Sequence, residues 1–166
     1  MKRLAQMKRV IFLGQQVASE NFYGTLDGIS MDKRIEMPVA EDMQVGMSIG
    51  MALEGFLPVC IIQRMDFLPR AADQIINHLG LIPELSGGLV SPKVIIRTTV
   101  GTRKPIDVGL QHSKNLTAMF RAAVSFPVLP VRNVKEVREA YNLAINGKKP
   151  VMIIEYQELY EGGDKK

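Results

Sequence analysis

One carboxylate stands where a strand ends and a helix begins, a place at which an acid can do chemistry. Glu41 follows the apolar run over residues 34–37 and opens a helical pattern that continues to residue 54. Such a carboxylate either stabilises the helix through its dipole, an effect of about 0.3–1 kcal/mol, or acts as an acid or base toward a ligand. Its position alone leaves both interpretations open.

The two histidines of the chain are the other candidates for proton transfer. His112 ends a polar loop that carries Arg103 and Lys104, and it precedes a helical pattern that Ser113 is placed to cap. A histidine in such a loop is either a proton-transfer group, because its charge changes near neutral pH, or a surface or capping side chain. His78 lies within a helical pattern, where we expect a helix-surface residue or a subunit contact.

Several common kinds of active site are excluded because their motifs are missing. The sequence has no pair of His and Cys at zinc-ligand spacing. It also has no Gly-x-Ser-x-Gly, Gly-x-Gly-x-x-Gly or phosphate-binding loop. The single cysteine, Cys60, lies between Val59 and Ile61, and we expect a buried apolar residue in a reducing compartment.

The elements that must position these residues alternate along the chain. Continuous runs rich in Val and Ile predict strands that are buried on both faces, and apolar residues at every third or fourth position predict helices. The predicted strands cover residues 9–13, 34–37, 58–63, 93–98, 126–131 and 150–155, and the predicted helices cover 42–54, 69–81, 114–124 and 133–145. This alternation predicts an α/β fold with a doubly wound, mostly parallel sheet of about six strands and helices on both faces. Ligands of such sheets bind beyond the carboxyl ends of the strands.

Capping residues support these boundaries. Asn133 can cap the helix that it precedes, Gly147 follows the end of that helix, and Gly55 follows the end of the first long helix. Inside that first helix, Gly46 and Gly50 each cost about 1 kcal/mol relative to alanine. Close packing of the helix against the sheet or against a partner would explain them.

Length and composition are those of a single domain that buries its own core. The chain has 166 residues, of which 46% are hydrophobic, and its formal net charge is +4. Its basic residues are scattered or lie near the two ends and form no stripe with aromatic residues, so nucleic-acid binding is not expected. We recognise no secretory leader and no apolar stretch of roughly 20 residues, and therefore expect a cytoplasmic protein that does not enter membranes.

The order of several short motifs along the chain is distinctive. They are Arg34-Ile35-Glu36-Met37-Pro38-Val39-Ala40-Glu41, Val45-Gly46, Ile49-Gly50-Met51-Ala52-Leu53-Glu54-Gly55, Ile62-Gln63, Asp66-Phe67, Ala72-Asp73-Gln74-Ile75-Ile76-Asn77, Ser86-Gly87-Gly88, Val94-Ile95-Ile96-Arg97, Gln111-His112-Ser113 and Glu155. With these motifs the chain resembles the pyrimidine-binding, amino-terminal domain of the beta subunits of thiamin-diphosphate-dependent 2-oxo acid dehydrogenases, in the transketolase-like family. The resemblance covers nearly all of residues 1–166 and implies one domain of that fold.

The resemblance implies a role for each of four residues. Glu41 would hydrogen-bond a ring nitrogen of the cofactor's aminopyrimidine, where an acid favours the imino tautomer that deprotonates the thiazolium carbon. Phe67 would stack on the pyrimidine ring, and Gln63 would lie on the same approach. His112 would face the substrate and either position it or transfer a proton.

The sequence also departs from the family pattern. Gln15 and Gln16 follow the first strand, where the family commonly has an acidic pair. The loop over residues 98–110 is poorer in glycine and carries Arg103 and Lys104, which would alter the choice of substrate. We also expect the chain to lack the carboxyl-terminal domain that follows in the family's beta subunits.

The diphosphate half of the cofactor site has no counterpart in the sequence either. In the family, a Gly-Asp-Gly segment and a downstream Asn hold the diphosphate through magnesium, and neither Gly163-Asp164 nor Asp27-Gly28 fits that pattern. The resemblance therefore implies that a separate diphosphate-binding, alpha-type subunit holds the magnesium. It also implies that the chain forms a homodimer or a heterotetramer.

Four functions compete at this point. The first is a catalytic subunit that, with its partner, decarboxylates a small 2-oxo acid and transfers the acyl or aldehyde unit. The second is split transketolase-like ketol transfer, the third a non-catalytic partner subunit, and the fourth a small-molecule-binding module unrelated to thiamin. The presence of Glu41, Phe67 and His112 together favours a catalytic role.

Overall fold

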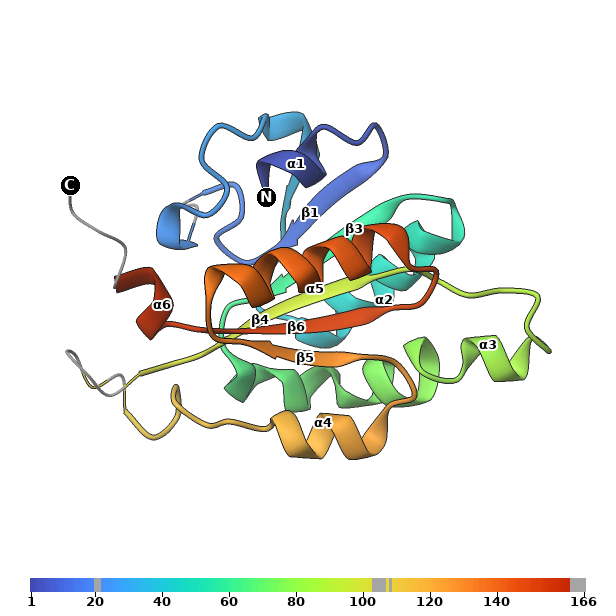
Figure 1. The fold of residues 1–166 in the computed structure, drawn as a ribbon. Coiled ribbons are helices and arrows are strands. Elements are labelled where there is room, and N and C mark those ends of the chain that lie inside the picture. The colour runs from blue at the N-terminus through green and yellow to red at the C-terminus, as the bar shows by residue number, and fades with distance from the viewer. Residues whose placement is uncertain (20–21, 103–106, 108, 162–166) are drawn as a thin grey trace.

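A six-stranded parallel sheet forms the centre of the molecule (Figure 1). The computed structural model describes residues 1–19, 22–102, 107 and 109–161. Within them the strands are β1 (Val10–Gly14), β2 (Arg34–Glu36), β3 (Leu57–Ile62), β4 (Ile95–Val100), β5 (Val128–Val131) and β6 (Val151–Tyr156). Their order is β2-β1-β3-β4-β6-β5, and each neighbouring pair is parallel. The predicted α/β fold is confirmed.

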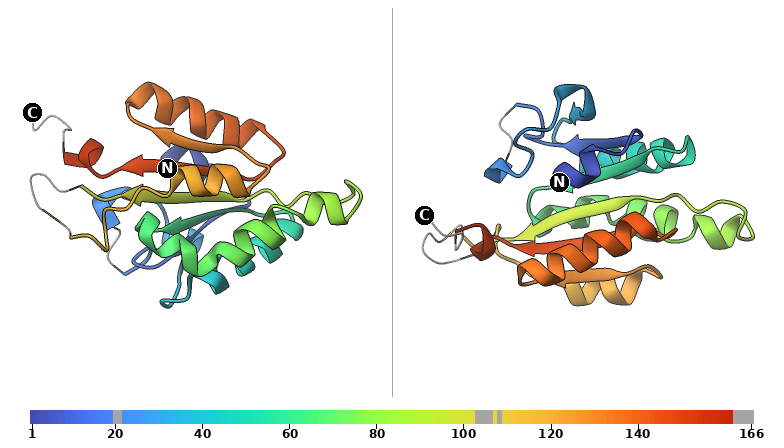
Figure 2. Two further views of the ribbon diagram at one scale, coloured as in Figure 1. Left: turned by 90° about the horizontal axis from the view of Figure 1, so that it is seen from below. Right: turned by 45° about the horizontal axis from the view of Figure 1, so that its top comes forward.

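Helices cover both faces of the sheet, as predicted (Figure 2). One face carries α1 (Lys2–Ala5) and α5 (Val134–Asn146), and the other carries α2 (Glu41–Leu53) and α4 (Thr117–Ala123). The remaining short helices are η1 (Phe22–Gly24), η2 (Met31–Lys33), η3 (Met65–Ala71), η4 (Gln74–Leu79), α3 (Ile82–Leu85) and α6 (Glu158–Glu161). Across the described ranges, none of the helices combines the length and the apolarity that crossing a membrane requires.

The central strands are apolar throughout because they lie between two separate cores. Every residue of β3 and of β4 is buried. Successive side chains of a strand point to opposite faces, so Cys60 and Ile62 pack with α2, η3 and α4, whereas Val59 and Ile61 pack with α1 and α5. This two-sided burial explains why the strands were visible in the sequence as continuous apolar runs.

The segment predicted as one helix over residues 69–81 is different in the structure. It begins earlier as the 3-10 helix η3, which contains Pro69, and continues as the π-helix η4. The reason is the spacing of the buried side chains, which is three residues in η3 and therefore fits a 3-10 helix. These buried side chains are Met65, Leu68 and Ala71. Because η3 starts directly after β3, it places Phe67 at the carboxyl edge of the sheet.

Three of the predicted helix caps are confirmed, and one is wrong. The Asn133 side chain accepts the Glu136 N–H at 2.9 Å, Gly147 ends α5, and Gly55 follows α2 with a φ of 80°. Ser113 does not cap α4, because that helix begins only at Thr117. The Ser113 hydroxyl instead donates to the carbonyl of Gly109 at 3.0 Å.

Candidate functional site

The predicted site residues lie at the carboxyl edge of the sheet, around the ends of β1, β2 and β3. Gln15 and Gln16 follow β1, Glu41 follows β2, and Gln63 and Phe67 follow β3. These strands are neighbours and parallel, so the segments that leave them meet at one edge. The contacts described next connect them.

Glu41 is buried and only partly paired. Its exposed fraction is 2%, and its Oε1 accepts a long hydrogen bond, 3.4 Å, from Gln15 Nε2. Arg70 Nε lies 2.8 Å from Oε2, but no N–H points at that oxygen, so the contact is ionic, and Oε2 accepts no hydrogen bond from the described part of the chain. The N-cap of α2 is Ala40 and no side chain caps it, so the side chain of Glu41 does not serve as the helix cap.

Gln63 is joined to Glu41 through the two glutamines that follow β1. Its Nε2 donates to the carbonyl of Gln15 at 3.1 Å and to Gln16 Oε1 at 2.5 Å. Its own carbonyl accepts the hydroxyl of Thr99. The two glutamines that stand where the family commonly has an acidic pair therefore form a polar network with Gln63 and Glu41.

Phe67 and His112 lie against each other although 45 positions of sequence separate them. Their ring centroids are 5.7 Å apart and the rings are nearly perpendicular, at 85°. Both side chains are half-buried. Phe67 belongs to the same short helix η3 as Arg70, so the element that carries Phe67 also contacts Glu41. The structure thus brings the four predicted residues to one edge of the sheet, in two linked groups.

A further carboxylate holds the turn that carries Gln16. The side chain of Glu36, at the end of β2, accepts the backbone N–H groups of Gln16 at 2.6 Å, Ala18 at 2.7 Å and Ser19 at 3.1 Å. Burial raises the pKa of Glu36, but these hydrogen bonds together with one from Val17 outweigh it and hold the pKa below its ordinary value. Glu36 therefore fixes the turn in which Gln16 adopts a φ of 55°.

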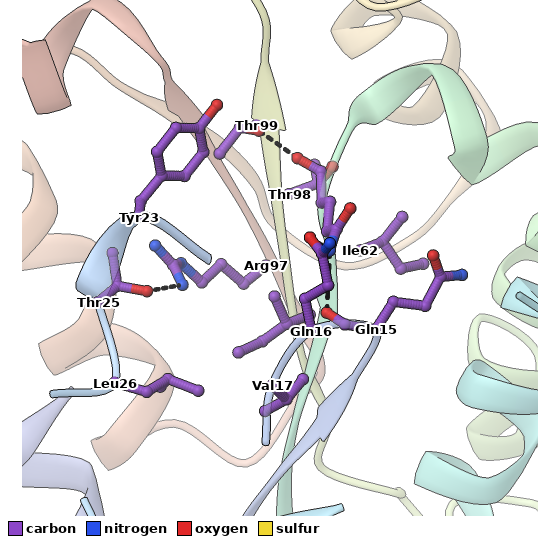
Figure 3. Close-up of a pocket in the computed structure, with 12 residues that line it drawn as sticks. Gln15, Gln16, Val17, Tyr23, Thr25, Leu26, Ile62, Arg97, Thr98 and Thr99 are labelled. Carbon is purple, nitrogen blue, oxygen red and sulfur yellow. Dashed lines mark hydrogen bonds between the residues drawn. The ribbon is translucent and has the colours of Figure 1, made fainter. Parts of the chain in front are cut away.

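A pocket opens beside this network, between the ends of β1, β3 and β4 (Figure 3). Gln63, Thr98 and Arg97 line it, and Tyr23 closes it from the loop that follows β1. Thr98 Oγ1 is buried and has no hydrogen-bond partner in the described ranges. Glu41, Phe67 and His112 are not among the lining residues, so this pocket adjoins their part of the edge without including it.

A buried ion pair closes the far side of the pocket. Arg97 Nε and Nη2 donate to Glu155 Oε2 at 3.1 and 2.8 Å, and Arg97 Nη1 donates to Thr25 Oγ1 at 2.8 Å. The hydroxyl of Tyr141 donates to Glu155 Oε1 at 2.8 Å, and that of Tyr160 donates to Oε2. Burial opposes the charge on Arg97, but the carboxylate of Glu155 raises the pKa of the guanidinium above its ordinary value. Each charged group of this network is matched by partners, so its role is structural.

Helix α2 has three exposed apolar side chains and the two predicted glycines. Met43, Met47 and Leu53 are exposed on it by 44%, 37% and 50%. A Cβ on Gly46 would lie 3.3 Å from Gln74 Oε1, so the glycine allows η4 to pack closely against α2. A Cβ on Gly50 would meet nothing within 4 Å. Packing within the described domain therefore explains Gly46 but not Gly50.

Two contacts of the site carried no signal in the sequence. Arg70 lies 29 positions after Glu41 and belongs to no motif, and Gln15 had been noticed only as a departure from the family pattern. The loop residues Arg103 and Lys104 lie outside the described residues. Over the described ranges, no group of three or more His, Cys, Asp or Glu side chains could hold a metal ion.

The chain is similar to several curated proteins over nearly its whole length. One is the pyruvate dehydrogenase E1 component subunit beta of Chlorokybus atmophyticus, with 26% identity over 96% of this chain and 48% of that protein. Another is the mitochondrial pyruvate dehydrogenase E1 component subunit beta of Homo sapiens, with 27% identity over 96% of this chain and 45% of that protein. The chain thus spans about half the length of these relatives.

A solved structure and a family model agree with these relatives. The fold is similar to that of a split gene transketolase, described as an inactive beta4 tetramer, with a TM-score of 0.69 and 18% identity over 90% of this chain and 45% of that one. At this identity the likeness concerns the fold alone. The family described as "Transketolase, pyrimidine binding domain" matches residues 2–162. With the match over almost every residue and the fold and edge geometry described above, the chain belongs to the transketolase pyrimidine-binding domain family.

Proposed function

We propose that the chain is the pyrimidine-binding subunit of a thiamin-diphosphate-dependent enzyme. Glu41 carries the proposal, because its carboxylate is 2% exposed and its Oε2, although ion-paired with Arg70 at 2.8 Å, accepts no hydrogen bond within the described residues. A buried acceptor that lacks a hydrogen bond costs about 1–3 kcal/mol. A ligand that donates a hydrogen bond to this oxygen is therefore favoured, and a ring nitrogen of an aminopyrimidine is such a donor in its protonated form.

The neighbouring side chains suit a flat heteroaromatic ring. Phe67 offers a half-buried aromatic surface for stacking, and Gln63 and Gln15 supply amide groups beside Glu41. His112 lies against Phe67, and in this proposal it faces the substrate. When bound, thiamin diphosphate supplies the nucleophilic carbon and the electron sink that decarboxylation needs. In this proposal Glu41 holds and orients the ring, and His112 positions the substrate or moves a proton.

The diphosphate end of the cofactor needs a second polypeptide in this proposal. The sequence contains no Gly-Asp-Gly segment, and we assign magnesium and the diphosphate to an alpha-type subunit. The exposed stripe of Met43, Met47 and Leu53, with the unexplained Gly50, supports an interface on α2. A homodimer or a heterotetramer would cover that stripe.

For the reaction, we propose decarboxylation of a small 2-oxo acid with transfer of the acyl unit. The similarity to proteins named pyruvate dehydrogenase E1 component subunit beta supports this choice. Split ketol transfer is the alternative outcome of the test. It would be recognised by turnover of a ketose donor with an aldose acceptor when no 2-oxo acid is present.

The test compares the chain alone with the chain assembled with its diphosphate-binding partner subunit. Calorimetric titration with thiamin diphosphate and magnesium should show weak binding by the chain alone and micromolar binding by the assembly. The assembly should release carbon dioxide from a 2-oxo acid, and Glu41→Gln should abolish this without changing the circular dichroism spectrum. Asp42→Asn, a change at the neighbouring exposed carboxylate, is the matched control and should retain activity. Micromolar binding and decarboxylation by the chain alone would refute the split-site proposal.

A further inference from the structure

The segment that carries His112 is tied to η3 by two hydrogen bonds. The backbone N–H of Lys114 donates to Asp66 Oδ1 at 3.2 Å, and the backbone N–H of Leu116 donates to the sulfur of Met65 at 3.3 Å. Both acceptors are side chains of the first two residues of η3. The segment after His112 is thereby fixed to the end of β3, and Asn115 Nδ2 also donates to the Tyr156 hydroxyl on β6 at 3.3 Å.

Asp66 connects the two segments that carry the aromatic groups of the candidate site. It directly precedes Phe67 in η3, and its side chain reaches the backbone two residues after His112. At the start of η3, the backbone N–H of Phe67 donates to the carbonyl of Arg64 at 3.1 Å. The position of the imidazole relative to the Phe67 ring therefore depends on where Asp66 holds the segment.

Only one oxygen of the Asp66 carboxylate is used in this way. Oδ1 accepts the Lys114 N–H, whereas Oδ2 is buried and accepts no hydrogen bond from the residues that the structure describes. An asparagine has the same shape and keeps one carbonyl oxygen as acceptor. The contact to Lys114 therefore needs an acceptor at this place but does not need a negative charge.

We propose that Asp66 is a positioning residue: by accepting the Lys114 N–H, it sets the His112 imidazole edge-on against the Phe67 ring. The placement of the imidazole does not depend on the identity of the cofactor. Its consequence for turnover rests on the proposed function, in which His112 faces the substrate. The two parts are tested by different measurements.

The first measurement uses the chain alone and reads the placement directly. The chain has only two histidines, so the carbon-bound ring protons of His112 and His78 are readily assigned in a nuclear magnetic resonance spectrum. The Phe67 ring should move the chemical shifts of these His112 protons away from the values of a solvent-exposed histidine. Asp66→Ala should move them back and make the Lys114 amide exchange about tenfold faster, as expected for the loss of a hydrogen bond to a charged group. Asp66→Asn should retain both properties.

Asp107→Ala is the matched control for a lost carboxylate in the same segment. Asp107 Oδ1 accepts the Gly109 N–H at 2.8 Å and so acts within its own turn. The Asp107→Ala substitution should leave the His112 signals and the Lys114 amide exchange unchanged. The proposal is overturned if Asp66→Ala leaves both readouts unchanged, or if Asp107→Ala changes them equally. A folded Asp66→Asn that behaves like Asp66→Ala would also overturn it, because the acceptor would then not be what matters.

The second measurement uses the assembled enzyme and separates positioning from cofactor binding. Asp66→Ala should lower kcat about tenfold and leave the affinity for thiamin diphosphate with magnesium within about twofold, whereas Asp66→Asn should keep most of the activity. An equal loss of affinity and rate would overturn the assignment to His112. If the spectra change as expected while the wild-type assembly shows no thiamin-dependent turnover, the proposed function fails and the placement by Asp66 stands.

Discussion

The buried pair of Arg97 and Glu155 offers the sharpest prediction about stability. The two side chains are 5% and 7% exposed, and Arg97 Nη2 lies 2.8 Å from Glu155 Oε2. Removing one partner of such a pair leaves a buried charge without compensation, at a cost of about 3–5 kcal/mol. Arg97→Met alone or Glu155→Gln alone should therefore lower the free energy of unfolding by about that amount.

The double variant should lose much less than the sum of the single losses. With Met at position 97 and Gln at position 155 no charge remains buried, and the amide oxygen can still accept one tyrosine hydroxyl. The remaining cost is that of the other hydroxyl, from Tyr141 or Tyr160, which loses its acceptor. That cost is about 1–3 kcal/mol, whereas additive losses would reach about 6–10 kcal/mol.

Urea unfolding followed by circular dichroism measures these free energies, and thermal unfolding checks them. For a chain of this length each kcal/mol lowers Tm by about 2–4 °C, so each single variant should lose roughly 6–20 °C. Lys135→Met is the control, because its partner Glu139 is 3.9 Å away and both side chains are largely exposed. It should change stability by less than about 0.5 kcal/mol. Single variants that lose under about 1 kcal/mol, or a double variant that loses the full sum, would refute the assignment of a coupled structural pair.

The remaining predictions concern the candidate site. His112→Ala should lower kcat of the assembled enzyme more than it lowers cofactor affinity, and steady-state kinetics with calorimetry would contradict this if both fell equally. Phe67→Ala should weaken thiamin diphosphate binding by about 1–3 kcal/mol, by analogy with bases that stack on aromatic side chains, and an unchanged dissociation constant would remove Phe67 from the site. Because the pKa of Glu36 is lowered in the folded chain, its hydrogen bonds to the turn over residues 16–19 should add stability above its unfolded pKa and lose it as the pH falls through the folded pKa. Glu36→Gln should therefore make the free energy of unfolding depend less on pH in the acid range. An unchanged pH dependence would contradict the role of Glu36.

The strands could be predicted from the sequence because their signal is local. In the buried strands β3, β4 and β6 the apolar run coincides with the strand to within two residues, since burial on both faces demands apolar side chains at every position. The prediction of a single helix over residues 69–81 was wrong, also for a local reason. Pro69 and a three-residue spacing of buried side chains favour a 3-10 turn, and both features are visible in the sequence.

The candidate site could be predicted only in part, because its contacts are not local. Glu41 was recognisable from its place between a strand and a helix, but the Gln15 amide and the Arg70 guanidinium reach it from two other loops. No periodicity or capping rule reports such contacts. The same holds for Asp66, whose partner Lys114 is 48 positions away. Ser113 shows the opposite error, because a good capping residue stood near a helix that begins four positions later.

The buried carboxylates of this chain differ in how completely their oxygens are hydrogen-bonded. Glu155 is buried and both of its oxygens have partners, which is what a stable core requires. Glu41 and Asp66 are different, because each has one oxygen that is buried without a hydrogen bond in the described residues. The two flank Phe67 along the chain and lie at the edge where parallel sheets bind ligands. Since the fold satisfies Glu155 completely on β6, the incomplete hydrogen bonding of Glu41 and Asp66 is a local feature of this edge. At Glu41, the proposed aminopyrimidine would supply the missing hydrogen-bond donor.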